Sequence, residues 1–450
     1  MQPTAATIIG AGPAGSLLGI FLARRGFAPT LYERRPDMRR TDIAAGRSIN
    51  LALADRGMYA LKRAGVLESV RSLMIPMRGR LLHDLDGATS LQPYGKDDSE
   101  VIYSISRGEL NKRLMTEFER ISGIPIRFRQ NYRGADFVRG TLTVLDEDRG
   151  STHIITAAPV IGADGASSAV REAMTHAGLA RATEDVLSHG YKELSIAPGA
   201  DGRHQLDANA LHIWPRGGFM LIALPNTDGS FTATLFLPLE GADSFAALTT
   251  APQVRSFFAR HFPDVGRLIP DLEGEFFEHL TGFMVTVRCN PWQVARRQLL
   301  IGDAAHAIVP FHGQGMNCAF EDCVVLDDLL GGHDGWGAIF DEFERVRAPN
   351  ADAIATMALE NYVEMRDTVR HPKFQLQKAL ALELERRYPQ RFIPRYSMVM
   401  FHHEIPYAVA LERGRVQQQI LDTLCAGVES IDQVDWQRAA ELVHAKLPKF

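Results

Sequence analysis

The sequence predicts a mixed α/β protein whose parallel sheet is assembled from separated segments of the chain. Three glycine-containing motifs lead to this prediction, because each follows a short apolar run that is typical of a buried strand. The motifs begin at Gly10, Gly162 and Gly302. Strand-like runs separated by polar turns lie between the second and third motifs, and helical periodicity dominates from Trp336 onward. We therefore expect an inserted antiparallel sheet and a C-terminal helical unit beside the α/β core.

The first motif has the spacing of a dinucleotide-binding turn. Gly-Ala-Gly-Pro-Ala-Gly at 10–15 follows the apolar run 7–9 and precedes an apolar helical stretch from Ser16 to Arg25. The first glycine permits a tight turn, the second lets the backbone approach a pyrophosphate, and the third lets the helix pack against its strand. The helix N-terminus offers free N–H groups to the phosphates. The motif therefore predicts a Rossmann-type nucleotide site.

An acidic residue stands where such a site needs one. Glu33 lies 23 residues after Gly10, at the end of a strand expected over Thr30–Tyr32. Its carboxylate would hydrogen-bond the ribose hydroxyls of an adenosine and repel a 2′-phosphate. The basic stretch that follows, from Arg34 to Arg40, is interrupted by Asp37. It is either a solvated loop or part of a contact to the phosphates of a pyridine nucleotide.

The other two motifs indicate that the dinucleotide is a flavin. A strand ends at the Asp164-Gly165 turn, and a helix should begin just after it; an ordinary capped helix is the alternative. In the third motif, Asp303 can accept a hydrogen bond from a ribityl hydroxyl. The glycines at 313 and 315 and the helix after them place N–H groups near the flavin pyrimidine, where negative charge develops on reduction. The three motifs in this order predict FAD.

Composition narrows the class of protein. The chain has 450 residues and a net charge of −5, so no basic excess exists to bind nucleic acid. Its four cysteines lack CxxC spacing and fit reduced thiols in a cytoplasmic protein. The sequence shows neither a signal peptide nor an apolar run of membrane-spanning length, so no membrane anchor is expected. No metal site is expected either, because the adjacent histidines His402 and His403 point apart on a helix or a strand.

The organisation of the chain divides it into three predicted parts. Segments 1–72, 100–180 and 286–332 should form the FAD-binding domain, 73–99 and 181–285 the substrate domain, and 333–450 a helical domain. Pro349 should mark the start of one helix, and the segment 391–394 should separate two others.

The three motifs resemble those of the single-component FAD-dependent aromatic hydroxylases with the p-hydroxybenzoate hydroxylase fold. That family binds FAD in one Rossmann-type domain and has no second such domain for NADPH, and this chain has no second strand followed by GxGxxG. Longer segments resemble the kynurenine 3-monooxygenase family within it, at 47–53, 76–80, 92–95, 189–194, 311–318, 360–366 and 392–399. The resemblance covers nearly the whole chain. It departs at the C-terminus, where mitochondrial members carry an apolar anchor, so the chain resembles the soluble bacterial form.

The resemblance implies hydroxylation of L-kynurenine to 3-hydroxy-L-kynurenine by O2, with NADPH reducing FAD and a flavin C4a-hydroperoxide delivering the oxygen. Kynurenine carries an amino-acid tail, and Arg80 can pair with its carboxylate through two hydrogen bonds. Tyr94 can add a hydroxyl donor. In the family, residues at the positions of Arg80, Tyr94, Asn361 and Tyr396 bind that tail. The alternatives are a surface ion pair for Arg80 and helix packing for Asn361 and Tyr396.

The resemblance also implies that Arg107 lies against FAD and that His312 forms a wall of the active site. The alternative for His312 is a loop histidine with a backbone partner, and His306 is expected to be structural. The expected cofactor-binding residues are Gly10, Gly12, Pro13, Ala14, Gly15, Glu33, Arg34, Arg47, Leu51, Arg107, Asp164, Asp303, Pro310, Gly313, Gly315, Met316 and Asn317.

Three other functions stay open. One is a hydroxylase of the same fold that acts on another aromatic acid. A second is a flavoprotein reductase or halogenase, although the sequence has no Trp-x-Trp-x-Ile-Pro motif for halogenation. The third is a non-catalytic FAD-binding module. Neither the choice of NADPH over NADH nor the oligomeric state follows from the residues, and a homodimer is one candidate.

Overall fold

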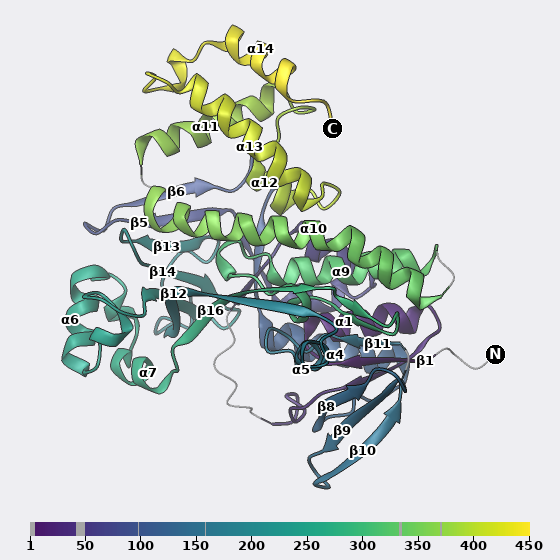
Figure 1. Ribbon diagram of the computed structural model, residues 1–450. Coiled ribbons are helices and arrows are strands. Elements are labelled where there is room, and N and C mark those ends of the chain that lie inside the picture. The colour runs from purple at the N-terminus through teal and green to yellow at the C-terminus, as the bar shows by residue number, and fades with distance from the viewer. Residues whose placement is uncertain (1–4, 42–49, 98, 158, 333–334, 370) are drawn as a thin grey trace. The chain divides into compact units, whose positions relative to one another are not determined.

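The computed structural model describes residues 5–41, 50–97, 99–157, 159–332, 335–369 and 371–450 (Figure 1). The chain forms two compact units, each assembled from three segments. Unit 1 comprises residues 1–74, 105–186 and 285–355, and unit 2 comprises 75–104, 187–284 and 356–450. The C-terminal helices belong to unit 2 in this division, and the three-part division of the sequence stays a prediction.

Unit 1 is built on a five-stranded sheet with the order β17-β18-β11-β1-β2. The strands are β1 (Ala5–Ile9), β2 (Ala28–Tyr32), β11 (Val160–Gly162), β17 (Gln293–Val294) and β18 (Gln298–Leu300). All neighbours run parallel except β17. A parallel sheet is covered on both faces, so its strands are continuous apolar runs. Ile8, Ile161 and Leu299 are accordingly fully buried.

Helix α1 (Pro13–Arg24) connects β1 to β2 and contacts α4 (Arg107–Ser122) and α9 (Gly315–Leu330). Unit 1 also holds a small antiparallel sheet of β8 (Gln130–Asp136), β9 (Thr141–Asp146) and β10 (Ser151–Thr156) (Figure 1). Its further elements are β3 (Asn50–Leu53), α2 (Asp55–Arg63), α3 (Leu67–Val70), α5 (Ala169–His176), α8 (Asp303–His306) and η4 (Pro310–His312).

Unit 2 carries most of a seven-stranded sheet with the order β16-β12-β15-β14-β13-β5-β6. The strands are β5 (Gly79–His83), β6 (Thr89–Pro93), β12 (Arg181–Ile196), β13 (Leu211–Pro215), β14 (Met220–Pro225), β15 (Phe231–Pro238) and β16 (Gly282–Asn290). Strands β12, β15, β14 and β13 pair antiparallel in that order, which confirms the predicted sheet. One pair differs, because β5 runs parallel to β13. Alternation along a strand reveals its faces but not its direction, so the sequence could not predict this.

One face of this sheet packs on two helices, α6 (Ala251–His261) and α7 (Leu272–Glu278). Leu221 and Leu235 from the strands are fully buried in the same core as Phe258 of α6. A second core joins α11 (Pro372–Arg387), α13 (Tyr407–Leu424) and α14 (Trp436–Lys446). The break at 391–394 separates α11 from α12 (Arg395–Phe401), as predicted.

The prediction that Pro349 begins a helix is wrong, because Pro349 lies inside α10 (Trp336–Val363). A proline inside a helix removes one backbone donor and weakens the turn before it. In that turn the side-chain amide of Asn350 donates to the carbonyl of Val346 at 2.9 Å. A π-helical turn, η5 (Glu364–Thr368), follows α10. Among the described residues, no helix combines the length and apolar character needed to cross a membrane.

Candidate active site

A cavity of about 460 Å³ lies in unit 1 beside the carboxyl ends of β1 and β11. Ligands of open α/β sheets bind at this edge. The expected cofactor-binding residues that line it are Gly10, Gly12, Pro13, Ala14, Glu33, Arg34, Leu51, Arg107, Asp164, Asp303, Pro310, Gly313, Gly315 and Met316. The structure thus brings residues from all three motifs to one cavity.

Two of the expected cofactor-binding residues, Gly15 and Asn317, do not line this cavity, nor does His312, and Arg47 lies outside the described residues. Gly15 packs on the turn, since a Cβ there would lie 2.0 Å from the carbonyl oxygen of Gly10. Asn317 accepts from the N–H of Ala54 at 2.9 Å and donates to the carbonyl of Ala52 at 2.8 Å, so it fixes β3. His312 is buried in η4, whereas Pro310 of the same turn and Gly313 directly after it line the cavity.

The glycine turn leaves space where a pyrophosphate would lie. Gly10 has a φ of +100°, and a Cβ on it would lie 2.5 Å from the carbonyl oxygen of Ala163. A Cβ on Gly12, by contrast, would meet nothing within 4 Å. Helix α1 begins at Pro13 with no side-chain cap, so its first N–H groups are available to an anion.

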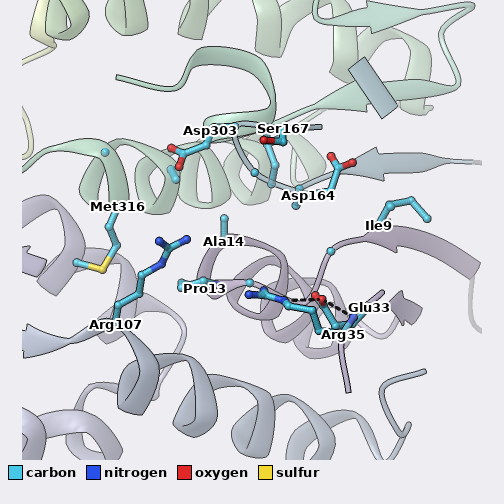
Figure 2. Close-up of a pocket in the computed structure, with 18 of the residues that line it drawn as sticks. Ile9, Pro13, Ala14, Glu33, Arg35, Arg107, Asp164, Ser167, Asp303 and Met316 are labelled. Carbon is cyan, nitrogen blue, oxygen red and sulfur yellow. Dashed lines mark hydrogen bonds and ion pairs between the residues drawn. The ribbon is translucent and has the colours of Figure 1, made fainter. Parts of the chain in front are cut away.

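Glu33 is buried at the end of β2 and braces the turn from the other side. Its Oε2 accepts from the N–H of Ala11 at 3.0 Å, and its Oε1 accepts from the backbone N–H and the Nε of Arg35, each at 3.0 Å. A carboxylate offers about four lone-pair sites, so it can still accept from ribose hydroxyls. Figure 2 shows this ion pair at the cavity wall.

Two acidic residues and one basic residue project into the cavity from different elements. Asp164 accepts from the Ser168 hydroxyl at 2.5 Å and from the N–H of Val170 at 3.2 Å, and burial raises its pKa. Ser168 caps α5, so the capped helix that the sequence left as an alternative is present beside the cavity. Arg107 begins α4 and Asp303 begins α8, and their side chains point toward the same space (Figure 2). A cavity with phosphate donors at one end and a cation beside acidic acceptors at the other fits FAD.

Sequence reasoning missed a side of the cavity formed by β8. Gln130, Asn131 and Tyr132 line it, although no motif marks this strand. The buried hydroxyl of Tyr132 has no hydrogen-bond partner within the described ranges, and burial raises its pKa. A buried donor without a partner destabilises a protein unless a ligand satisfies it. Tyr132 is therefore a further candidate contact.

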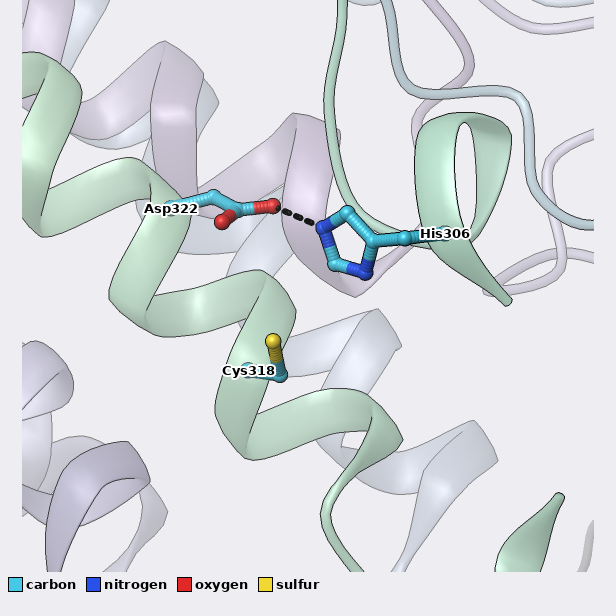
Figure 3. A group of neighbouring side chains, drawn as sticks. All are labelled: His306, Cys318 and Asp322. Atoms are coloured by element: carbon cyan, nitrogen blue, oxygen red, sulfur yellow. Dashed lines mark hydrogen bonds and ion pairs between the residues drawn. The ribbon is translucent and has the colours of Figure 1, made fainter. Parts of the chain in front are cut away.

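A buried network of charged residues contacts the turn of the third motif. His306 Nε2 lies 2.7 Å from Asp322, and Cys318 lies one turn from Asp322 on α9 (Figure 3). These three ligand atoms lie within 4.8 Å of one another, a spacing that a metal could use. However, Arg347 donates to Asp322 at 2.7 Å and to the Cys318 sulfur at 3.3 Å, so a guanidinium already supplies the positive charge. Asp322 also accepts from the N–H of Gly302 at 2.8 Å, which fixes the turn before Asp303.

Replacing Arg347 with methionine should destabilise the protein by about 3–5 kcal/mol, because the buried carboxylate of Asp322 loses its guanidinium counter-ion. The matched control is Arg345→Met on the same helix, whose side chain is 71% exposed and pairs with Glu342. Such an exposed pair contributes about 1 kcal/mol or less. Urea unfolding of both variants measures the difference, and equal losses would contradict a structural role for the network.

The same network should make stability fall in acid. Burial opposes the charge of Asp322, but His306 and Arg347 outweigh it and lower its pKa to about 2. The ionised Asp322 carboxylate therefore stabilises the folded protein, and this contribution is complete at pH values above the ordinary pKa of about 3.9. The contribution is lost as the pH falls toward 2, where the carboxylate takes up a proton.

Unit 2 contains a second cluster of expected site residues, formed by Arg80, Tyr94, Asn361, Glu364 and Tyr396 and called here the Arg80 cluster. Arg80 is 3% exposed and donates to Glu364 at 3.0 Å and to Asn361 at 3.3 Å. Its guanidinium lies 4.9 Å from the ring centre of Tyr396, and that ring stacks on Tyr94 at 5.6 Å. The ion pair that the sequence left as an alternative is present, but it is buried rather than on the surface.

The Tyr94 hydroxyl is buried beside Arg80 and Tyr396, and it makes no hydrogen bond of standard geometry in the part of the chain that the structure describes. Burial also raises the pKa values of Tyr94 and Tyr396, so both stay neutral donors. Burial opposes the charge of Arg80, yet the Glu364 carboxylate 3.0 Å away outweighs it and raises the pKa of Arg80. Glu364 lies on the π-helical turn, and no role was expected for it from the sequence because no motif predicts such a turn.

Comparison with known proteins gives consistent relatives. The family described as FAD binding domain matches residues 3–357. Kynurenine 3-monooxygenase of Myxococcus xanthus is 50% identical over 99% of this chain and 96% of its own length, and that of Stenotrophomonas maltophilia is 50% identical over 98% and 97%.

Solved structures share the fold at low identity. The tetrameric form of 2-methyl-3-hydroxypyridine-5-carboxylic acid oxygenase aligns with a TM-score of 0.66 at 20% identity, over 84% of this chain and 96% of that one. Tetracycline destructase Tet(55) aligns with a TM-score of 0.60 at 19% identity, over 80% and 89%. By its matched domain and its full-length relatives, the chain belongs to the FAD-binding kynurenine 3-monooxygenase family.

Proposed function

We propose that this protein uses FAD, NADPH and O2 to hydroxylate L-kynurenine at the ring carbon beside the aniline amine, giving 3-hydroxy-L-kynurenine and water. The observation that carries the proposal is the Arg80 cluster. It combines a buried guanidinium, a neighbouring carboxylate and a buried tyrosine hydroxyl. An α-amino acid presents a carboxylate and an ammonium on the same carbon atom, and this set of groups matches both charges.

Each charge of the substrate tail has a partner in the cluster. Arg80 pairs with the carboxylate, and the hydroxyls of Tyr94 and Tyr396 donate to the same oxygens. Glu364 gives up part of its pairing with Arg80 and accepts from the ammonium. Asn361 orients Arg80 through the 3.3 Å hydrogen bond that already exists. The cluster therefore exchanges an internal ion pair for two pairs with the substrate, which limits the cost of burying its charges.

The cavity of unit 1 holds the cofactor. Gly12 and the N-terminus of α1 bind the pyrophosphate, Glu33 the adenosine ribose and Asp303 the ribityl chain. Arg107 and the N-terminus of α9 face the flavin, where they favour the negative charge of the reduced ring. When bound, FAD takes up hydride from NADPH and activates O2 for transfer to an electron-rich ring. We assign His312 to the wall of the reaction site.

The protein's part in the chemistry is positioning and exclusion of water. The anilino group of kynurenine activates its own ring, so no side chain has to act as a nucleophile or a dedicated base. The four cysteines are buried free thiols, which supports a reducing, cytoplasmic location.

A hydroxylase of another aromatic acid is the second candidate. A plain aromatic carboxylate would use Arg80 but would bring no ammonium group to pair with Glu364. The presence of Glu364 in the cluster therefore favours a substrate with an amino-acid tail.

Kynurenine should accelerate oxidation of NADPH by the purified flavoprotein, because this class gates flavin reduction on substrate. The measurement follows NADPH absorbance with and without kynurenine, and chromatography identifies 3-hydroxykynurenine. Anthranilate, which keeps the aniline ring and lacks the tail, serves as the comparison substrate. Equal rates with and without kynurenine would contradict gating, and rapid hydroxylation of anthranilate would favour the second candidate.

A further inference from the structure

We propose that Lys378 is a second cation for the substrate carboxylate, so that substrate binding depends on whether this side chain carries its proton. This inference rests on the proposed function, since it concerns how the Arg80 cluster takes an amino-acid tail. Lys378 lies on α11, which contributes no member of the cluster and carries no motif.

The sheet register places Lys378 next to Arg80. Arg80 on β5 and Gln92 on β6 are directly opposed across an antiparallel pair, so their side chains share one face of the sheet about 5 Å apart. Lys378 Nζ lies 3.5 Å from Oε1 of Gln92. Gln92 is itself held, because its amide donates to the carbonyl of Val369 at 3.3 Å. The ammonium is thus anchored beside the guanidinium.

No carboxylate within the described ranges lies at salt-bridge distance from Lys378. The charged groups that act on it are Arg80 of β5, which opposes its charge, and Glu364 of η5, which favours it. Glu364 is already paired with Arg80 at 3.0 Å. The nearby side chain of β6 is the neutral Gln92. Two cations therefore share one carboxylate, and the set is one anion short.

A substrate carboxylate bound between Arg80 and Lys378 would be a counter-ion to both, while the substrate ammonium pairs with Glu364. Burial, followed by the charge of Arg80, lowers the pKa of free Lys378 to about 7, so near neutral pH part of the protein holds the uncharged amine. A bound carboxylate favours the ammonium and raises this pKa again. Binding then takes up a proton from solution. Below pH 7 Lys378 is already charged and binding is tightest; above pH 7 the dissociation constant rises, by at most about tenfold per pH unit.

The test measures the dissociation constant of kynurenine for the FAD-loaded enzyme between pH 6 and 8.5, from the change in flavin absorbance. We compare the unaltered protein with Lys378→Met, Lys378→Arg and Lys373→Met, an exposed lysine on the same helix. Lys378→Met should weaken binding roughly tenfold or more at pH 6, the loss expected for one charge-assisted hydrogen bond. It should leave affinity at pH 8.5 nearly unchanged, so its pH profile becomes flat.

Lys378→Arg should keep tight binding across the whole range, because arginine stays charged. Lys373→Met should retain the original profile. Kynurenamine, which lacks the carboxylate, should show no difference between the unaltered protein and Lys378→Met. A profile that is the same with and without Lys378 would overturn this inference while leaving the proposed function intact. Failure of kynurenine to bind the unaltered protein at any pH would instead overturn the proposed function.

Discussion

Replacing Arg80 with methionine should abolish most kynurenine binding while the protein keeps its FAD. The guanidinium is 3% exposed and forms the centre of the Arg80 cluster, so the substrate carboxylate would enter a buried site without its main counter-ion. Removing one partner of a buried charge pair costs about 3–5 kcal/mol. That loss corresponds to roughly two to four decades in affinity. Flavin absorbance titrations with kynurenine measure it directly.

Two controls separate recognition from folding. FAD content should be unchanged, because Arg80 belongs to unit 2 and the cavity residues belong to unit 1. The unaltered protein should bind kynurenamine far more weakly than kynurenine. The affinity for kynurenamine should be nearly the same in the unaltered protein and in Arg80→Met. If the variant loses flavin, or if its Michaelis constant for kynurenine stays within about threefold, then Arg80 is only a structural partner of Glu364.

Replacing Glu33 with alanine should weaken FAD binding more than any other single change at the adenosine end. The change removes the acceptor of the Ala11 N–H and frees Arg35, so the glycine turn loses its brace. It also removes the proposed bonds to the ribose hydroxyls, each worth about 1.5–3 kcal/mol. We expect FAD affinity to fall by at least about tenfold per bond lost.

Equilibrium dialysis of the apoprotein with FAD measures the effect. Glu172→Ala, an exposed acid on α5 of the same unit, is the matched control and should bind FAD normally. Kynurenine affinity of protein reloaded with excess FAD should match the unaltered enzyme. Unchanged flavin affinity in Glu33→Ala would show that the carboxylate only braces the turn and that the turn tolerates its loss.

The sequence predicted the nucleotide turn well because that information is local. The strand expected at 7–9 belongs to β1, and the helix expected from Ser16 begins three residues earlier, at Pro13. These elements, the glycines between them and the acid at 33 lie within one β-α-β span, where spacing alone determines geometry. The side of the cavity formed by β8 could not be predicted. Tyr132 reaches the cavity through the pairing of distant segments, and nothing in its own neighbourhood marks it.

The same contrast holds for the Arg80 cluster. Family resemblance named four of its members, but Glu364 and the neighbouring Lys378 emerged only from three-dimensional placement. Glu364 meets Arg80 across 284 positions of sequence, and a π-helical turn gives it that direction. At Pro349 a local signal was misleading. A proline is typical of a helix start, but here the helix α10 continues through it.

The order of the chain has a consequence for its synthesis on the ribosome. The last residue that lines the cavity is Phe320, and unit 1 ends at Ala355. Three members of the Arg80 cluster, Asn361, Glu364 and Tyr396, come later in the sequence. A nascent chain therefore contains every part of its cofactor cavity before it has the means to recognise substrate. A chain whose translation stops between these points would have all the residues of the cofactor cavity. It would lack the residues proposed to recognise kynurenine.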